Sequence, residues 1–419
     1  MKLEFGFGSG VQTVDVPDAN YKGSLLANPI PAGLRGEDAV KAALDNPIGA
    51  PLLEKVISPG ETVAIVTSDI TRPCPSWQIL PTLLDRLYAA GIHREDITLV
   101  FALGSHRRQT EDEKRHLAGD RAYSEIRCID SDPDDYVHLG STSIGTPVDI
   151  FRPVAEADHV ICLGNIEYHY FAGYSGGAKA VMPGVSTRAA IQSNHRMMVR
   201  DEACAGRLEG NPIREDIEEA GQILGIDYIL NVVLDEHKNI VYAVAGDVVK
   251  AHRAGCAFLD RLYSKKIDKR ADIVLVSQGG APKDLNLYQT QKALDNAKHA
   301  VRDGGVVILI GSCKEGLGEK TFEAWIRDAK APQDLINRVK TGFKLGGHKA
   351  AAIAMVLEHA SVYLVSELPD DLVRSCFLIP YKDAQTALQD AFMELGPDAS
   401  VLAMPYGGST LPHAASAAD

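Results

Sequence analysis

The chain has 419 residues, 45% of them hydrophobic and 24% charged, and carries a formal net charge of −13. This length is too great for one ordinary core and predicts two or three domains, while the composition is typical of a soluble globular protein. The acidic balance argues against a nucleic-acid-binding surface, which needs clustered Lys and Arg, but it is compatible with a locally basic pocket for an anionic substrate.

Neither the cysteines nor the apolar runs indicate an exported or membrane-bound protein. The seven cysteines are scattered and form no Cys-x-x-Cys pair, which argues against a disulfide framework or a Cys-rich zinc site and favours a reducing compartment. The amino terminus lacks a basic head followed by an apolar core, and no run approaches the roughly 18 apolar residues of a membrane span. We therefore expect a cytoplasmic protein with no nucleic-acid or membrane partner.

Strand-like and helix-like segments alternate through the first part of the chain. Strands are predicted at 2–7, 61–67, 96–103 and 159–163, helices at 37–44, 77–90, 211–224 and 248–263, and a hairpin over 228–245. Since strands that alternate with helices form parallel, doubly wound sheets, the loops after the second, third and fourth strands should meet at one edge. Open α/β sheets bind their ligands at that edge.

The second part of the chain repeats this pattern. Residues 265–270 are polar and predict a crossing to a second domain, with strands at 271–277, 306–310, 362–365 and, more weakly, 377–379, and a helix at 287–299. The predicted fold class is α/β, with two Rossmann-like domains of mostly parallel sheets and an active site in the interdomain cleft. We assign residues 1–268, rejoined by 402–419, to an N-terminal domain and residues 269–401 to a C-terminal domain.

The loop at 164–195 combines chemical groups that no packing role requires. It follows a buried strand and contains His169, a Gly-Gly pair, Lys179 and His195. Glycines let the backbone approach a ligand, a lysine amine can carry charge or form a covalent bond, and histidines transfer protons or bind metals. Each feature alone is more often a turn, a solvated lysine or an exposed histidine, but together in one loop they favour a functional site.

The two other strand ends carry further candidates. Asp69 and Arg72 suit a nucleotide-like ligand or a carboxylic acid, because a carboxylate can hold a ribose hydroxyl and a guanidinium can bind phosphate or carboxylate with two hydrogen bonds. An ion pair that braces the turn is an equal alternative. His106 is placed as a general base, although a histidine at a strand end is as often a capping or packing residue.

In the predicted second domain, Tyr288, Gln289 and Lys292 lie near the amino end of a helix, where the helix dipole favours an anion. A Tyr and a Lys four residues apart also match the pair of short-chain dehydrogenases, but the glycine fingerprint of that family is missing upstream, and an exposed helix face competes with both interpretations. His348 and Lys349 open another helical stretch and either line the pocket or simply start the helix.

Taken together, these motifs resemble the nickel-dependent lactate racemase family. The resemblance covers most of the chain and rests on SDITRP at 68–73, GSHR at 104–107, HYFAGYSGGAKAVMPG at 169–184, NH at 194–195 and NLYQTQK at 286–292. The long motif with its glycines, lysine and flanking histidines is highly specific, whereas GSHR or SDITRP alone would be weak.

The resemblance implies a cofactor and a role for each candidate residue. The cofactor would be nickel held by pyridinium-3,5-bisthiocarboxylic acid mononucleotide, a nickel-pincer nucleotide covalently attached to Lys179, with His195 as the protein-derived nickel ligand. His106 and His169 would be the two acid/base residues, one on each face of the substrate. The residues that would hold the mononucleotide are Asp69, Ile70, Thr71 and Arg72, and those that would bind the substrate are Arg72, Tyr288, Gln289 and Lys292.

The implied activity is a racemase or epimerase of a 2-hydroxy acid. Loss of the α hydrogen as hydride to an electron-poor pyridinium leaves a stable 2-keto acid, which takes the hydride back on its other face while two histidines move the hydroxyl proton. The partners would be the small 2-hydroxy acid and the proteins that make the cofactor. The polar ring and amine at His348 and Lys349 favour an acid larger or more polar than lactate.

Two alternatives stay open on the residues alone. One is a divalent-metal hydrolase or lyase that uses His106, His169 and His195. The other is a non-catalytic protein that binds a nucleotide cofactor, against which the two opposed bases argue.

Overall fold

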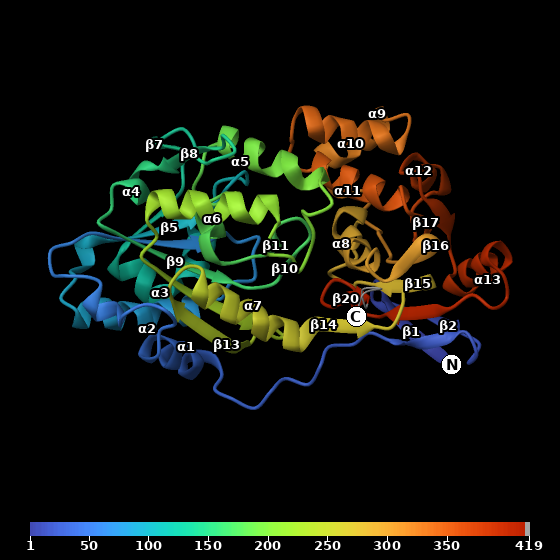
Figure 1. The fold of residues 1–419 in the computed structure, drawn as a ribbon, viewed down its shortest axis with the longest axis horizontal. Coiled ribbons are helices and arrows are strands. Elements are labelled where there is room, and N and C mark those ends of the chain that lie inside the picture. The colour runs from blue at the N-terminus through green and yellow to red at the C-terminus, as the bar shows by residue number, and fades with distance from the viewer. Residues whose placement is uncertain (415–419) are drawn as a thin grey trace. The chain divides into compact units, whose positions relative to one another are not determined.

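The structure, a computed structural model, describes residues 1–414. The chain forms two compact units, which we call the central unit (Pro29–Arg261) and the terminal unit (Met1–Asn28 together with the described residues from Leu262 onward). Figure 1 labels many of the helices and strands of both units.

The central unit is built on a six-stranded sheet with the order β13-β12-β9-β4-β5-β6. Its strands are β4 (Val63–Ser68), β5 (Ile97–Ala102), β6 (Arg127–Asp130), β9 (His159–Asn165), β12 (Tyr228–Leu234) and β13 (Ile240–Gly246). All neighbouring pairs are parallel except the β12–β13 hairpin. The prediction of a mostly parallel sheet with a terminal hairpin is confirmed.

Helices cover both faces of this sheet, which is why its central strands are apolar throughout. One face packs through a single apolar cluster against α1 (Gly36–Asp45), α2 (Ser76–Ala89) and α3 (Glu111–Glu125). Leu80, Leu83, Leu84 and Leu87 of α2 lie in that cluster, at the spacing of one helix face. The other face carries α6 (Pro212–Leu224) and α7 (Lys250–Tyr263), as Figure 1 shows.

The remaining elements of the central unit are short. They are η1 (Leu53–Lys55), η2 (Arg94–Asp96), β7 (Tyr136–Ser141), β8 (Pro147–Phe151), α4 (Arg152–Ala155), β10 (Tyr168–His169), β11 (Gly173–Tyr174), η3 (Gly177–Ala180), α5 (Arg188–His195) and η4 (Arg196–Val199). β7 pairs with β8 and β10 with β11, both antiparallel. The loop predicted at 164–195 therefore folds into a small hairpin, a 3-10 turn and a helix.

The terminal unit has an all-parallel six-stranded sheet in the order β18-β17-β16-β15-β19-β3. Its strands are β3 (Tyr21–Ser24), β15 (Ala271–Ser277), β16 (Val301–Ile310), β17 (Ala360–Val365), β18 (Ile379–Tyr381) and β19 (Val401–Met404). One face packs against α13 (Ala384–Leu395) and the hairpin of β1 (Lys2–Phe7) and β2 (Gly10–Asp15). The other helices of the unit are α8 (Leu287–Ala297), α9 (Lys320–Asp328), α10 (Pro332–Thr341), α11 (Gly347–Leu357) and α12 (Asp370–Ser375).

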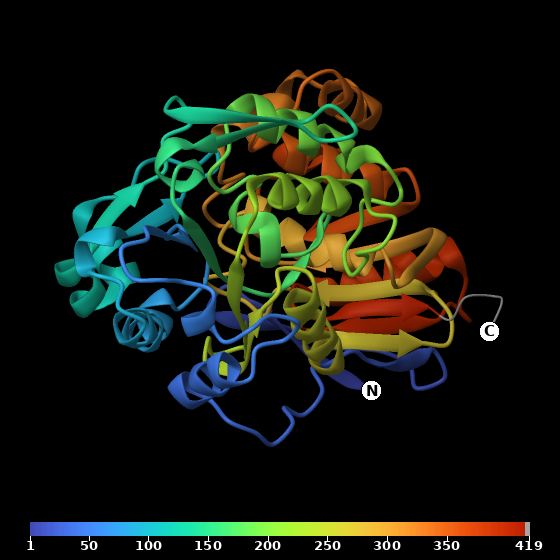
Figure 2. The ribbon, with the colours of Figure 1, turned by 60° about the vertical axis from the view of Figure 1, so that its left-hand side comes forward.

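Both ends of the chain belong to the terminal unit, which differs from the predicted domain boundaries. The polar segment expected as a crossing forms β14 (Ser264–Ile267), which pairs in parallel with β20 (Leu411–Ala414). β19 is buried between β15 and β3, and Figure 2 shows red C-terminal strands beside yellow ones from the middle of the chain. The expected return of 402–419 to the N-terminal domain is therefore wrong for 402–414. The apolar β19 instead forms hydrogen bonds to β15 on one side and to β3 on the other. Residues 415–419 lie outside the described range.

No helix in the described part of the chain is long and apolar enough to cross a membrane.

All seven cysteines are free thiols, and five of them are buried. Burial raises the pKa of the Cys74 thiol to about 11, which leaves it protonated and unreactive near neutral pH.

His159, the first residue of β9, ties together the starts of three neighbouring strands. Its Nε2 lies 2.8 Å from Glu61 Oε2, just before β4, and its Nδ1 lies 3.2 Å from Asp227 Oδ1, just before β12. Burial opposes the charged ring, but the hydrogen bond to Glu61 and the negative charges of Glu61 and Asp227 outweigh burial and raise the pKa of His159.

We expect this contact to make stability depend on pH. Because the folded-state pKa is raised above the unfolded value, the contribution is complete below the unfolded pKa and is lost as pH rises through the folded pKa. His159→Gln should therefore lower the free energy of unfolding more at about pH 5.5 than at about pH 9. Urea unfolding at both values measures this, with His116→Gln, an exposed site on α3, as the control; an equal loss at both pH values would contradict it.

Candidate functional site

Three loops rich in polar groups leave the same edge of the central sheet. β9, β4 and β5 are consecutive parallel neighbours, so their carboxyl ends lie side by side. The loops that follow them carry Asp69 to Arg72, His106, and the 164–195 segment. The structure thus confirms the prediction that these loops share one edge, and it allows their side chains to form one site.

Asp69 and His106 form a hydrogen-bonded pair across two of these loops. His106 Nδ1 lies 2.5 Å from Asp69 Oδ2, and the Thr71 hydroxyl donates to Asp69 Oδ1 at 2.7 Å. Burial of Asp69 favours its neutral form, but the hydrogen bonds from His106 and Thr71 and the charge of Arg72 outweigh burial and lower its pKa. A carboxylate on Nδ1 leaves the lone pair of the neutral ring on Nε2, which is the arrangement of a general base.

The other two histidines are separated by one aromatic ring. Phe171 meets His169 edge-on at 4.4 Å between ring centroids and His195 edge-on at 4.9 Å. Burial, together with the positive charges of Lys179 and Arg72, lowers the pKa of His169 well below its usual value. His169 Nδ1 accepts a hydrogen bond from the Ala172 amide at 3.3 Å, so the neutral ring carries its proton on Nε2.

Lys179 lies in η3, in surroundings that favour an uncharged amine. Burial is the largest cause, and the nearby guanidinium groups of Arg72 and Arg214 add to it, so that the pKa of Lys179 falls well below its usual value. A neutral lysine amine is a nucleophile, whereas the ammonium form is not. The lowered pKa therefore favours the form of Lys179 that can make a covalent bond.

Arg214, on α6, holds the backbone of the loop that carries these groups. Its side chain is fully buried and donates to the carbonyl oxygens of Ala172, Tyr174 and Gly176. The Ala172 and Gly176 carbonyls also accept the amides of Tyr174 and Lys179, so the guanidinium adds further donors that tie this segment of the loop to α6.

Three more residues complete this support. Asn231 Oδ1 accepts the Gly177 amide at 2.7 Å, His252 Nε2 donates to the Ser175 carbonyl at 2.8 Å, and Asp260 accepts the hydroxyls of Tyr168 and Tyr174. Gly176 has a φ of +79°, and a Cβ there would lie 2.7 Å from Asn231 Oδ1, so only glycine fits.

The sequence analysis missed Arg214, Asn231, His252 and Asp260. Asn231 left a signal, since it is a lone polar residue in the apolar strand β12. The other three residues lie on the amphipathic helices α6 and α7: Arg214, His252 and Asp260. On such helices the sequence does not distinguish a polar side chain that faces solvent from one that is buried.

Among residues 1–414, no three His, Cys, Asp or Glu side chains are arranged as a set of metal ligands, and His106, His169 and His195 do not form such a set.

The substrate-binding residues predicted in the terminal unit lie together on α8. Asn286 caps this helix by accepting the Gln289 amide, and Tyr288, Gln289 and Lys292 follow in its first turns. The buried Lys349 of α11 donates to the Tyr288 carbonyl at 3.0 Å, and its amine lies 4.4 Å from the centre of the Tyr288 ring. Lys349 therefore fixes Tyr288, a role that the sequence left open.

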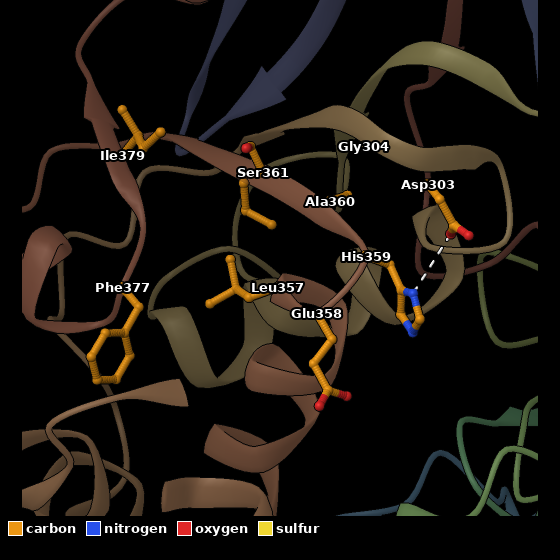
Figure 3. Close-up of a pocket in the computed structure, with 10 residues that line it drawn as sticks. Asp303, Gly304, Leu357, Glu358, His359, Ala360, Ser361, Phe377 and Ile379 are labelled. Atoms are coloured by element: carbon orange, nitrogen blue, oxygen red, sulfur yellow. Dashed lines mark ion pairs between the residues drawn. The ribbon is translucent and has the colours of Figure 1, made fainter. Parts of the chain in front are cut away.

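A separate hollow of about 450 Å³ lies at the amino ends of β16, β17 and β18 (Figure 3). Its lining includes Leu357, Phe377 and Ile379, with His359 and Asp303 at 3.6 Å from each other. None of the predicted site residues lines it, and it is at the end of the sheet opposite to the one where α/β proteins bind ligands.

The chain is similar to lactate racemases along nearly its whole length. The lactate racemase N-terminal domain model matches residues 7–206, and the lactate racemase C-terminal domain model matches residues 266–411. The lactate racemase of Thermoanaerobacterium thermosaccharolyticum is 33% identical over 98% of both chains, and that of Lactiplantibacillus plantarum is 32% identical over 94% of this chain and 96% of the relative.

Solved structures agree. The lactate racemase apoprotein from T. thermosaccharolyticum has a TM-score of 0.89 at 31% identity, covering 98% of this chain and 100% of that one. A Thermotoga maritima protein, at 20% identity and a TM-score of 0.65 over 91% of this chain and 100% of that one, shows likeness of fold alone.

The support of the loop by Arg214 generates one prediction. Arg214→Met removes the guanidinium donors from three carbonyls of the loop, and we expect a loss of about 3 kcal/mol in stability and faster hydrogen exchange in residues 172–177. Arg86→Met is the control, because Arg86 lies on α2 and pairs with Glu54 without contacting the loop. Unchanged exchange in Arg214→Met would show that the guanidinium does not hold the loop.

A second prediction concerns the amine of Lys179. Acetic anhydride at about pH 7 should label Lys179, and Arg72→Gln should slow this labelling by about threefold or more, because removal of a positive charge raises the pKa of the amine. Quantitative peptide mass spectrometry measures the label. Arg107→Gln, which removes an exposed arginine paired with Glu113, should leave the rate unchanged.

Proposed function

The chain belongs to the lactate racemase family, a family of isomerases, and we propose that it interconverts the stereoisomers of a 2-hydroxy acid by proton-coupled hydride transfer. The observation that carries this proposal is the sheet edge where a half-buried Lys179 with a lowered pKa shares a loop with His169, next to the loops of the Asp69–His106 pair. Such an edge offers a covalent anchor and two acid/base groups at once.

The residues present fit the nickel-pincer nucleotide that we propose as cofactor. The neutral amine of Lys179 suits a covalent link to it, and a single protein ligand from His195 suits a metal whose other ligands come from the nucleotide. When bound, this group supplies the electron-poor pyridinium that accepts and returns a hydride. The proposal also requires partner proteins that make the nucleotide.

Within this site we assign His106 as the base that takes the hydroxyl proton through Nε2. Asp69 holds its ring and stabilises the positive charge that develops on it. His169 serves the oxygen on the other face of the planar 2-keto acid, to which it returns a proton from its imidazolium form, since the neutral ring with its proton on Nε2 donates only a hydrogen bond. The two histidines exchange roles in the reverse direction.

The remaining candidates bind the cofactor and the substrate. Asp69 already uses both oxygens for His106 and Thr71, so in holding the mononucleotide it acts through Thr71, and we assign direct contacts to Ile70, Thr71 and Arg72. Tyr288, Gln289 and Lys292, together with Arg72, would bind the substrate carboxylate and hydroxyl. The buried Lys349, which contacts Tyr288, and its buried neighbour in sequence, His348, lead us to propose a substrate side chain larger or more polar than the methyl group of lactate.

The test begins with protein made in a host that assembles the cofactor. We expect intact mass spectrometry to find an adduct on Lys179 with about one nickel per chain. Lys179→Ala should lose adduct and nickel, whereas Lys238→Ala, at an exposed turn, should keep both. A Lys179→Ala protein with bound nickel and full activity would refute the proposal.

The same preparation tests the acid/base roles. His106→Asn and His169→Asn should keep the adduct but lose racemisation, followed by chiral chromatography, by about a hundredfold or more. A panel of single-enantiomer 2-hydroxy acids that includes lactate defines the substrate, and fastest turnover of lactate would contradict the larger or more polar side chain. An unmodified mass with bound zinc would instead favour a hydrolase, and one with no metal a binding protein.

A further inference from the structure

Asn194, the residue before His195, is held in one orientation by its neighbours. Its side chain is fully buried on α5, and its Nδ2 donates to Asp216 Oδ2 at 2.7 Å and to the Ile213 carbonyl at 3.2 Å. Both partners are oxygens that accept hydrogen bonds, so they must face the amide nitrogen. The amide oxygen is therefore the atom that faces His195.

This orientation sets the tautomer of His195. Its Nδ1 lies 2.8 Å from Asn194 Oδ1, an oxygen that can only accept. The ring must then carry a proton on Nδ1, and the neutral ring has its lone pair on Nε2. Coordination of a metal by Nε2 needs this tautomer, because a proton on Nε2 would occupy the position of the metal.

Asp216 anchors the arrangement from α6. It is buried, and its second oxygen accepts the Thr142 hydroxyl, so both oxygens have fixed donors. A chain of hydrogen bonds thus runs from Thr142 through Asp216 and Asn194 to His195. The edge-on contact with Phe171, at 4.9 Å, packs against the ring at the end of this chain.

We propose that Asn194 and Asp216 are positioning residues that fix His195 in the Nδ1–H tautomer and so prepare Nε2 as the ligand for the metal. That the group bound by Nε2 is a metal rests on the proposed function, whereas the tautomer of His195 does not. Histidine ligands of metals typically have such partners on the other ring nitrogen, and their loss typically costs about 10- to 100-fold in metal affinity.

The first experiment uses the cofactor-free protein. Long-range ¹H–¹⁵N correlation spectra of protein labelled with ¹⁵N-histidine report the tautomer of each ring, and His195→Gln identifies the signals of His195. We expect the Nδ1–H tautomer in the unsubstituted protein. The Nε2–H tautomer there would overturn the proposal, whatever the variants do.

Variants then test the chain of hydrogen bonds. Asn194→Leu and Asp216→Leu should give a mixture of tautomers at His195, while Asp216→Asn, which keeps an acceptor for Asn194, should retain Nδ1–H. Ser193→Ala is the matched control, because it removes a hydrogen bond to Thr146 from the same helix outside the chain. An unchanged tautomer in a folded Asn194→Leu protein would contradict the role of Asn194.

A second readout separates this inference from the proposed function. In protein that carries the cofactor, Asn194→Leu should lose nickel about 10- to 100-fold faster than Ser193→Ala during dialysis against a chelator, with the mass adduct on Lys179 intact. Equal rates would overturn the positioning role. If no adduct or nickel forms at all, the proposed function fails, and the tautomer measured in the cofactor-free protein still decides the inference.

Discussion

The central unit depends on one constraint, which is that a loop of irregular backbone at the end of β9 must be buried to present its side chains. Buried carbonyls need donors, and local backbone amides supply only part of them here. The guanidinium of Arg214 provides donors to three carbonyls, and Asn231 and His252 bond Gly177 and Ser175. These bonds tie the segment between His169 and Lys179 to α6, α7 and β12.

The same support has an electrostatic effect. Arg72 and Arg214 place positive charge near Lys179 and His169, and both of these groups have lowered pKa values. A chain with a net charge of −13 thus has positively charged side chains concentrated around Lys179 and His169. Such a field suits anionic ligands, and phosphate and carboxylate groups are what a mononucleotide and a hydroxy acid would bring to it.

The sequence predicted the strands that carry the site, because β4, β5 and β9 are continuous apolar runs that end abruptly in polar residues. It also predicted that their loops meet, since that follows from parallel order alone. It did not predict the buried polar side chains that hold the loop and His195. Arg214 and Asp216 lie on an amphipathic helix, where the sequence pattern indicates a solvent-exposed polar face. Nor did it predict the pairing of β14 with β20, because a four-residue segment with three polar residues becomes a strand only when a partner from a distant part of the sequence is present.

The pairing of β19 with β3 has a consequence for how the polypeptide reaches its native state as it leaves the ribosome. Tyr21 lies in register with Val401, so the terminal sheet joins residues from the first and last parts of the chain. The central unit is continuous in sequence and can fold while synthesis proceeds. The terminal sheet must wait for β19, and the buried side chains of the β1–β2 hairpin, Phe5 and Val14, gain their partner surface only when the later strands of that sheet have been made.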